Sequence, residues 1–275
     1  MLLLLAFAAG GLLAPLLYVA WQLDRAPTHT PEAVLAAGRP QGSLLLCLGD
    51  SITHGRIGAD WVGRLRQEHG GALAVVNGGV NGELVWNVRQ RAQTAMALRP
   101  DFTVLMIGTN DVMAADRPDR ARGYERSNRL PQSPTLAWSI AELAALTAEL
   151  KLACPRVALC TIPPLGDDPS APAEALVREY NGRLGSVARA AGVELIDIHA
   201  ALCALEPGGG RAYQGGIWAV VALVLRATAA RYLFGRSWDA IARSAGWHLT
   251  VDGIHLSDRA GAVVAEAVNA WSERG

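Results

Sequence analysis

Short apolar runs alternate with stretches of helical periodicity along most of the chain. The first run is apolar at every position from 44 to 48, which is typical of a strand buried on both faces of a parallel sheet. Strands are predicted at residues 43–48, 72–76, 102–107, 156–161 and 193–198. Helices are predicted at residues 61–68, 84–98, 135–152, 173–191 and 258–271. This alternation predicts an α/β fold with helices on both faces of a parallel sheet.

Glycines and small polar residues directly follow the first three strand runs. The segments are residues 49–55, which contain Ser51, residues 77–82, which contain three glycines, and residues 108–111, which contain Asn110. The carboxyl ends of parallel strands meet at one edge of the sheet, where ligands bind in open α/β folds. A serine hydroxyl, glycine amides and an asparagine amide are therefore predicted to converge there.

A carboxylate and an imidazole precede the last predicted helix. Asp252 and His255 are three residues apart, so one turn of chain can bring them together. A serine hydroxyl needs a base, an imidazole can take its proton, and a carboxylate can orient the imidazole. An anionic tetrahedral intermediate also needs fixed donors, which glycine amides and an asparagine side chain can supply. Ser51 is the predicted nucleophile, with His255 as base and Asp252 as the orienting acid.

These four segments, in this order, resemble the sequence blocks of the SGNH hydrolases of the GDSL family. Residue 52 is isoleucine where the family often has leucine. The resemblance covers residues 44–275 apart from two insertions, and it implies a three-layer α/β/α sandwich with a five-stranded parallel sheet in flavodoxin-like order. It implies that no metal or cofactor is needed. It also implies an oxyanion hole formed by the Ser51 and Gly82 amides and the Asn110 side chain, with Gly79 as the alternative to Gly82.

The resemblance implies hydrolysis of a small-molecule carboxylic ester through an acyl-enzyme on Ser51. Lipid or acylated-sugar esters are the expected substrates. One alternative is acyl transfer to an acceptor hydroxyl with the same triad. The other is a binding module that keeps the fold without catalysis. The sequence does not indicate an oligomeric state.

Other acids and histidines compete for these roles. Asp50 precedes the nucleophile and is expected to bond amides of its own turn. His54 is expected to lie beside the site or at its rim. Asp197 and His199 form a second acid–histidine pair after the fifth strand, and we expect a structural role for them.

The first 23 residues carry no charged side chain and could cross a bilayer. They predict a membrane anchor, with a cleaved signal peptide as the alternative. Residues 24–42 are expected to form a linker to a hydrolase domain at residues 43–275. An extracytoplasmic catalytic domain is expected, by analogy with secreted esterases. Arg25 and Arg39 favour the alternative, a cytoplasmic domain.

Two insertions interrupt the strand–helix rhythm. Residues 112–134 carry five arginines and are expected to be a solvated excursion, or a rim that receives an anionic substrate. The second insertion, residues 208–247, contains the apolar run 217–225. A buried helix is expected there, with a lid or a patch that touches a bilayer as alternatives.

Composition excludes several other classes. The formal net charge is zero, with 25 basic and 25 acidic residues, so no basic footprint for nucleic acid is present. The chain has no phosphate-binding loop that ends in Gly-Lys-Ser/Thr. The four cysteines show no zinc spacing, and two lie in predicted strands as buried thiols.

Overall fold

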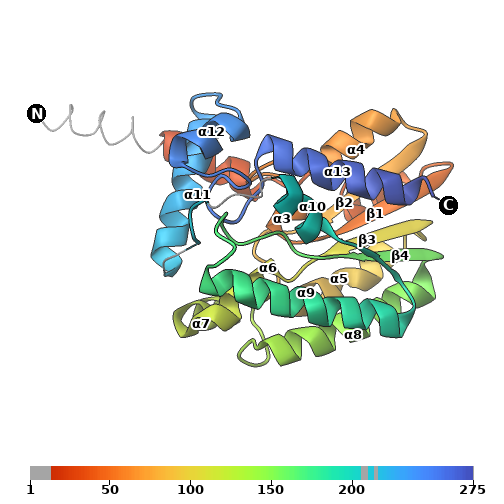
Figure 1. Ribbon diagram of the computed structural model, residues 1–275. Helices are drawn as coiled ribbons and strands as arrows, with labels where there is room; N and C mark the ends of the chain where they lie inside the picture. The colour runs from red at the N-terminus through yellow and green to blue at the C-terminus, as the bar shows by residue number, and fades with distance from the viewer. Residues whose placement is uncertain (1–13, 206–209, 214–215, 275) are drawn as a thin grey trace, which may run out of the picture.

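The computed structural model describes residues 14–205, 210–213 and 216–274. Its centre is a five-stranded parallel sheet with the strand order β2-β1-β3-β4-β5. This order confirms the predicted flavodoxin-like fold, which Figure 1 shows from the side. The strands are β1 (Ser43–Gly49), β2 (Leu73–Gly79), β3 (Phe102–Met106), β4 (Arg156–Cys160) and β5 (Glu194–Ile196).

Helices cover both faces of the sheet and complete the three layers (Figure 1). One face carries α5 (Val85–Met96), α8 (Leu136–Ala153) and α9 (Pro172–Ala191), and the other carries α4 (Trp61–His69), α10 (Ile198–Leu205) and α13 (Asp258–Ser272). Successive strand side chains point to opposite faces. Leu44, Leu46 and Leu48 therefore enter the first core, whereas Leu45 and Cys47 enter the second.

The register of the sheet brings three strand ends to one level. Gly49 at the end of β1 pairs with Gly79 of β2 and with Met106 of β3. The short helix α3 (Ser51–His54) follows β1, and α6 (Thr109–Asp116) follows β3. The three polar segments predicted to converge thus start from the same edge of the sheet.

Two regions expected to lack regular structure contain helices. Residues 24–42 contain α2 (Pro31–Ala37), which buries Val34 in the core on the α5 side. The arginine-rich insertion contains α7 (Pro118–Ser127), which begins with a proline at its first position. A short or mostly polar helix shows little apolar periodicity, so the pattern of the sequence did not predict these two.

The second insertion forms α11 (Ile217–Tyr232) and α12 (Trp238–Ala245). Val220 and Ala227 of α11 are buried, but Trp218, Val221 and Leu225 are exposed. The expectation of a buried helix is therefore wrong for one face of α11. α11 packs against α7 and α12 at one end of the molecule. The face that carries Trp218, Val221 and Leu225 points away from these helices and is not covered by any described residue.

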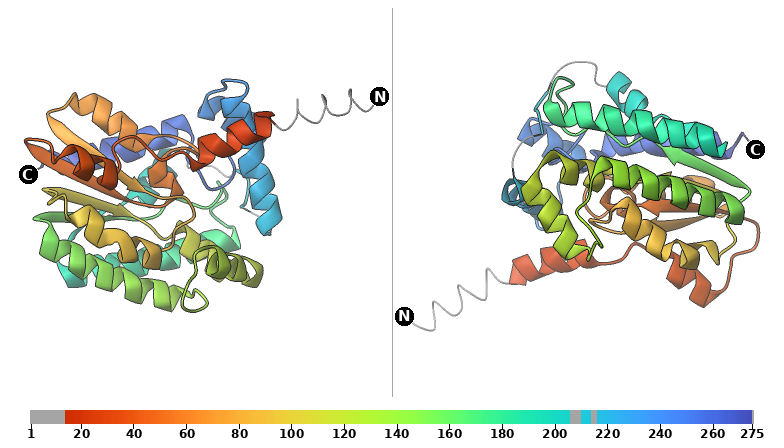
Figure 2. Two further views of the ribbon diagram at one scale, coloured as in Figure 1. Left: turned by 180° about the vertical axis from the view of Figure 1, so that it is seen from behind. Right: turned by 90° about the horizontal axis from the view of Figure 1, so that it is seen from below.

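The N-terminal helix, residues 14–24, lies at the same end of the molecule as α11 in all three views (Figures 1 and 2). It buries Val19 and Gln22 and exposes most of its other side chains. Residues 1–13 of the predicted anchor lie outside the described residues. Within the described ranges, no helix has both the length and the apolar character needed to cross a membrane.

Candidate active site

The turn after β1 fixes the position of Ser51. The Oδ1 atom of Asp50 caps α3 by accepting a hydrogen bond from the Ile52 amide at 2.9 Å, as predicted for Asp50. A Cβ atom at Gly49 would lie 2.2 Å from Thr53 Oγ1 and 2.4 Å from the Met106 carbonyl oxygen. Only glycine therefore allows β1 to pass this close to α3 and β3.

Ser51, His255 and Asp252 form one hydrogen-bonded chain. The distance from Ser51 Oγ to His255 Nε2 is 2.9 Å, and the distance from His255 Nδ1 to Asp252 Oδ2 is 2.7 Å. All three residues are buried. With the ring proton on Nδ1, Nε2 is free to accept the serine proton. The structure thus brings together the three residues predicted as nucleophile, base and acid.

The loop that carries Asp252 and His255 is closed by its own backbone. The Val251 amide donates to the His255 carbonyl at 2.8 Å, and the Ile254 and His255 amides donate to Asp252 Oδ1 at 3.0 and 2.9 Å. Burial acts to raise the pKa of Asp252, but His255 and the two amides outweigh it and hold the pKa below its ordinary value. Asp252 is therefore a carboxylate at neutral pH.

The glycines after β2 have different surroundings. The Gly79 amide donates to Asn77 Oδ1 at 2.9 Å, and Asn77 Nδ2 donates to the Thr53 carbonyl at 2.9 Å. A Cβ at Gly79 would lie 2.2 Å from the His54 amide nitrogen, so this position also requires glycine. No described residue accepts a hydrogen bond from the Gly82 amide.

Both ends of the Asn110 side-chain amide are held. Its Nδ2 donates to the Glu83 carbonyl at 2.8 Å, which leaves the second Nδ2 hydrogen available. Its Oδ1 accepts a hydrogen bond from the Tyr124 hydroxyl at 2.7 Å. The Glu83 segment is itself fixed, because its carboxylate lies 2.7 Å from the Arg91 guanidinium, which also donates to the Gly78 carbonyl.

Tyr124 reaches this site from α7, in the arginine-rich insertion. Part of its ring is exposed, but its hydroxyl lies in the interior, and burial raises the pKa of Tyr124 well above its ordinary value. The phenol therefore stays protonated and acts as the hydrogen-bond donor to Asn110 Oδ1. Sequence reasoning missed this residue, because no motif joins a tyrosine on an exposed helix to the asparagine of a distant turn.

A family model of GDSL-like lipases and acylhydrolases matches residues 47–262. The chain belongs to this family. The match spans more than half of the chain and includes the serine, asparagine, aspartate and histidine described above. The predicted enzyme class, a carboxylic ester hydrolase of the GDSL type, is confirmed. No curated protein matches the chain.

Solved structures of similar fold include other hydrolases. The acetylxylan esterase Axe2 from Geobacillus stearothermophilus has a TM-score of 0.55 at 21% identity, over 82% of this chain and 93% of that one. LAE5, an alpha/beta hydrolase enzyme from the metagenome of Lake Arreo in Spain, has a TM-score of 0.57 at 21% identity, over 84% and 95% of the two chains. At this identity, the likeness establishes the shared fold.

Two polar neighbours of Ser51 in this GDSL-family protein are not part of the hydrogen-bonded chain from Ser51 to Asp252. Asp50 Oδ2 is buried and has no partner among the described residues, and burial raises the pKa of Asp50 to about 7. His54 is buried, and burial together with Arg56 lowers its pKa to about 4. His54 is therefore neutral at physiological pH, and no hydrogen bond connects it to Ser51 within the described structure.

The second predicted acid–histidine pair does not form. Asp197 Oδ1 accepts from the Thr161 hydroxyl at 2.9 Å and from the Ala200 amide at 3.0 Å, at the start of α10. His199 Nε2 instead lies 2.6 Å from Oε1 of Glu174, a buried residue of α9. Sequence reasoning missed Glu174, because helical packing brings it to His199 from 25 positions away.

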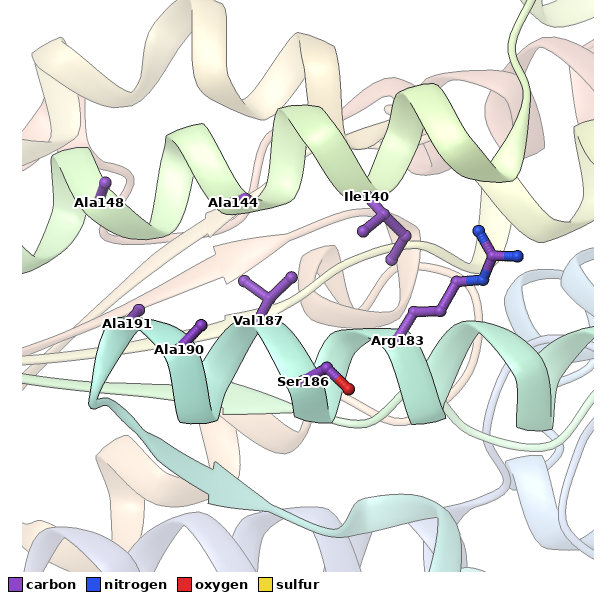
Figure 3. A pocket seen from close by; sticks show the side chains of 8 residues that line it. All are labelled: Ile140, Ala144, Ala148, Arg183, Ser186, Val187, Ala190 and Ala191. Carbon is purple, nitrogen blue, oxygen red and sulfur yellow. The ribbon is translucent and has the colours of Figure 1, made fainter.

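Two further features lie away from the triad of this acylhydrolase. Among the described residues, no group of three or more histidine, cysteine, aspartate or glutamate side chains could hold a metal ion. A groove of about 640 Å³ lies between α8 and α9, and Figure 3 shows the side chains that line it. It contains no acid–base pair, and its lining is mainly small and aliphatic: Ile140, Ala144, Ala148, Arg183, Ser186, Val187, Ala190 and Ala191.

Proposed function

We propose that the protein hydrolyses carboxylic esters through an acyl-enzyme on Ser51. The proposal rests on the continuous hydrogen-bonded chain from Ser51 through His255 to Asp252. His255 takes the hydroxyl proton as Ser51 Oγ attacks the acyl carbon, and then gives that proton to the leaving alkoxide. Water attacks the acyl-enzyme in the second half, again with His255 as base. Ionised Asp252 stabilises the imidazolium in both halves.

The proposed oxyanion hole contains three donors. The Ser51 amide is in the first turn of α3 and has no partner within that helix. The free Nδ2 hydrogen of Asn110 is the second donor, and the Gly82 amide is the third. Gly79 is the weaker alternative to Gly82, because its amide is already bonded to Asn77.

Tyr124 is the proposed positioning residue of this oxyanion hole. An asparagine amide can flip about its last torsion and exchange its oxygen and nitrogen. A donor placed 2.7 Å from Asn110 Oδ1 and an acceptor placed 2.8 Å from Nδ2 favour one orientation only. That orientation directs the remaining N–H away from the Glu83 carbonyl.

Lipid or acylated-sugar esters are the proposed substrates. The Geobacillus neighbour is named as an esterase of acetylated xylo-oligosaccharides, which supports the acylated-sugar class. Alanine replacements of a serine, an aspartate and a histidine in that protein are named as catalytic mutants. The exposed apolar side chains of α11 support the lipid class.

Turnover of p-nitrophenyl acetate and butyrate by the purified protein tests the proposal. We expect hydrolysis that is lost in Ser51→Ala, together with covalent labelling of Ser51 by a fluorophosphonate probe. Equal turnover in the two proteins would refute the proposal. Failure to label would favour a binding module. Formation of an acylated sugar when acceptor alcohols are added would identify acyl transfer instead of hydrolysis.

A further inference from the structure

Exposed apolar side chains are concentrated at one end of the molecule. Within the described residues, fourteen large hydrophobic side chains are exposed, and nine of them lie in residues 16–21 and 218–234. Single exposed leucines are common on soluble proteins, but a contiguous cluster marks an interaction surface. We call these two segments the apolar end, and all three views place them together (Figures 1 and 2).

The outer face of α11 is apolar because its exposed large hydrophobic residues are spaced to fall on one side of the helix. Trp218, Val221 and Leu225 occupy positions i, i+3 and i+7, so they form one stripe along the helix. Trp218 is 81% exposed, and Phe234 just beyond the helix is 76% exposed. A surface helix normally exposes its polar face to solvent. In α11 the solvent-exposed face carries large apolar side chains.

Both parts of the apolar end are tied to loops that border the triad. The Leu23 carbonyl at the end of the N-terminal helix accepts a hydrogen bond from Asn81 Nδ2 at 2.8 Å, one residue before Gly82. The Tyr232 hydroxyl at the end of α11 donates to the Arg56 carbonyl at 2.6 Å, in the loop after α3. The apolar end therefore flanks the strand edge that holds Ser51.

We propose that the apolar end docks onto the surface of a lipid bilayer. Tryptophan side chains such as Trp21 and Trp218 prefer the boundary between acyl chains and headgroups. Arg25, which stacks on the Trp21 ring at 5.3 Å, and exposed Arg226 border the apolar surface and suit anionic headgroups. Residues 1–13, which precede this surface in the chain, carry no charged side chain. Docking of this kind requires no membrane-spanning helix.

Fluorescence quenching by lipid tests this contact directly. Single cysteines at Trp218→Cys or Leu225→Cys, in a Cys203→Ser background, are labelled with an environment-sensitive dye. Cys47, Cys154 and Cys160 are buried and stay unlabelled. The full chain is mixed with phosphatidylcholine–phosphatidylglycerol vesicles that carry a doxyl quencher on the acyl chains. We expect the emission at 218 and 225 to fall about twofold relative to vesicles without quencher.

Leu152→Cys is the matched control. Leu152 is 91% exposed and lies shortly before β4, at the amino edge of the sheet, opposite to the edge that holds the triad. Its dye should keep its emission. A second variant keeps the test independent of any one label: Trp218→Asp with Leu225→Asp should abolish quenching of a dye at Phe234→Cys, with an unchanged circular dichroism spectrum.

Two outcomes would overturn the proposal. The first is equal quenching at 218 and 152, or none at either position. The second is concentration-dependent shielding of residue 218 from aqueous iodide without lipid, which would identify a second copy of the chain as the partner. Neither readout depends on enzymatic activity, so failure here leaves the proposed hydrolysis standing, and the reverse also holds.

Discussion

His255 and His199 each lie against a buried carboxylate, and only His255 meets a serine hydroxyl in line. His255 Nδ1 is 2.7 Å from Asp252, and His199 Nε2 is 2.6 Å from Glu174. Each histidine also has a hydroxyl or thiol nearby. The acid–imidazole contact alone therefore does not distinguish a catalytic pair from a structural one.

The difference lies in the third partner. Ser51 Oγ is 2.9 Å from His255 Nε2, whereas Cys203 Sγ is 3.8 Å from one ring nitrogen of His199 and 4.0 Å from the other. A sulfur almost equidistant from both ring nitrogens is in line with neither lone pair, so it is poorly placed to give its proton to the imidazole. Burial and Glu174 also raise the pKa of Cys203, so the thiol stays protonated.

The two histidines also differ in their place along the sheet edge. Ser51 follows β1, and the strand order changes direction between β1 and β3, where crevices form in open α/β sheets. His199 follows β5, the last strand of the sheet. Oxyanion donors from neighbouring strands can surround the first site, while only one strand adjoins the second.

Alanine replacements of His255 and His199 should have very different effects on turnover. We expect His255→Ala to lower kcat by roughly 10⁴-fold or more, because Ser51 loses its base. His199→Ala should change kcat by less than about threefold but lower the free energy of unfolding by about 1–3 kcal/mol, because buried Glu174 loses a partner. Ester turnover and urea denaturation measure the two effects. A large loss of kcat in His199→Ala would contradict this division.

The proposed oxyanion donor, Asn110, has no counterpart in the His199 region. Asn110→Ala should lower kcat by about 10²- to 10³-fold with little change in KM, because the donor acts on charge that develops in the transition state. Steady-state kinetics on a neutral ester check this. Asn87→Ala is the control, because Asn87 caps α5 and does not contact Asn110. An equal loss in both variants would point to folding instead.

Tyr124→Phe should lower turnover less than Asn110→Ala does. Loss of one hydroxyl frees the Asn110 amide to flip, and we expect kcat to fall about tenfold with KM unchanged. In an Asn110→Ala background the same change should have no further effect, because Tyr124 acts through Asn110. Tyr180→Phe is the control: its buried hydroxyl donates to the Ile107 carbonyl at 3.1 Å. Additive losses in the double variant would refute positioning.

A pH-dependent effect on stability, with no role in turnover, is expected from Asp50, a buried carboxyl group without a histidine partner. Burial raises its pKa to about 7, so the folded chain holds a proton that the unfolded chain has released above about pH 4. This group therefore lowers the free energy of unfolding as pH rises from about 4 to 7. Asp50→Asn should remove a slope of at most about 1.4 kcal/mol per pH unit in urea denaturation.

Asp168→Asn is the control for this slope. Asp168 is partly exposed, and hydrogen bonds from Ser170 hold its pKa below the ordinary value. Its titration therefore lies below the window, and its replacement should leave the slope unchanged. An identical slope in Asp50→Asn and the parent protein would show that Asp50 is ionised in the folded chain.

Most of the fold could be predicted because each strand and long helix carries its own local signal. Strand-length apolar runs and amphipathic stretches predicted the five strands and the long helices to within a few residues. α2 and α7 lack that signal, since one is a single short segment and the other is mainly polar. The exposed stripe of α11 could not be predicted, because an apolar run is the same in sequence whether or not a neighbour covers it.

The residues of the candidate site were likewise only partly predictable from the sequence. Ser51, Asn110, Asp252 and His255 lie in short segments with a recognisable pattern, and the structure places the first, third and fourth within hydrogen-bonding reach in a row. Tyr124 and Glu174 act on residues that are distant along the chain or on other elements. Their positions follow from tertiary packing, which single-sequence patterns do not report.

The closely packed glycines at the ends of β1 and β2 limit which positions of this enzyme can be substituted. Gly49 and Gly79 have no space for even one additional carbon, so the frame that presents Ser51 accepts no variation at these positions. New substrate preferences must therefore come from segments outside that frame. A mutant library that aims to redirect the enzyme should keep both glycines fixed and randomise the exposed positions of α7 and α11.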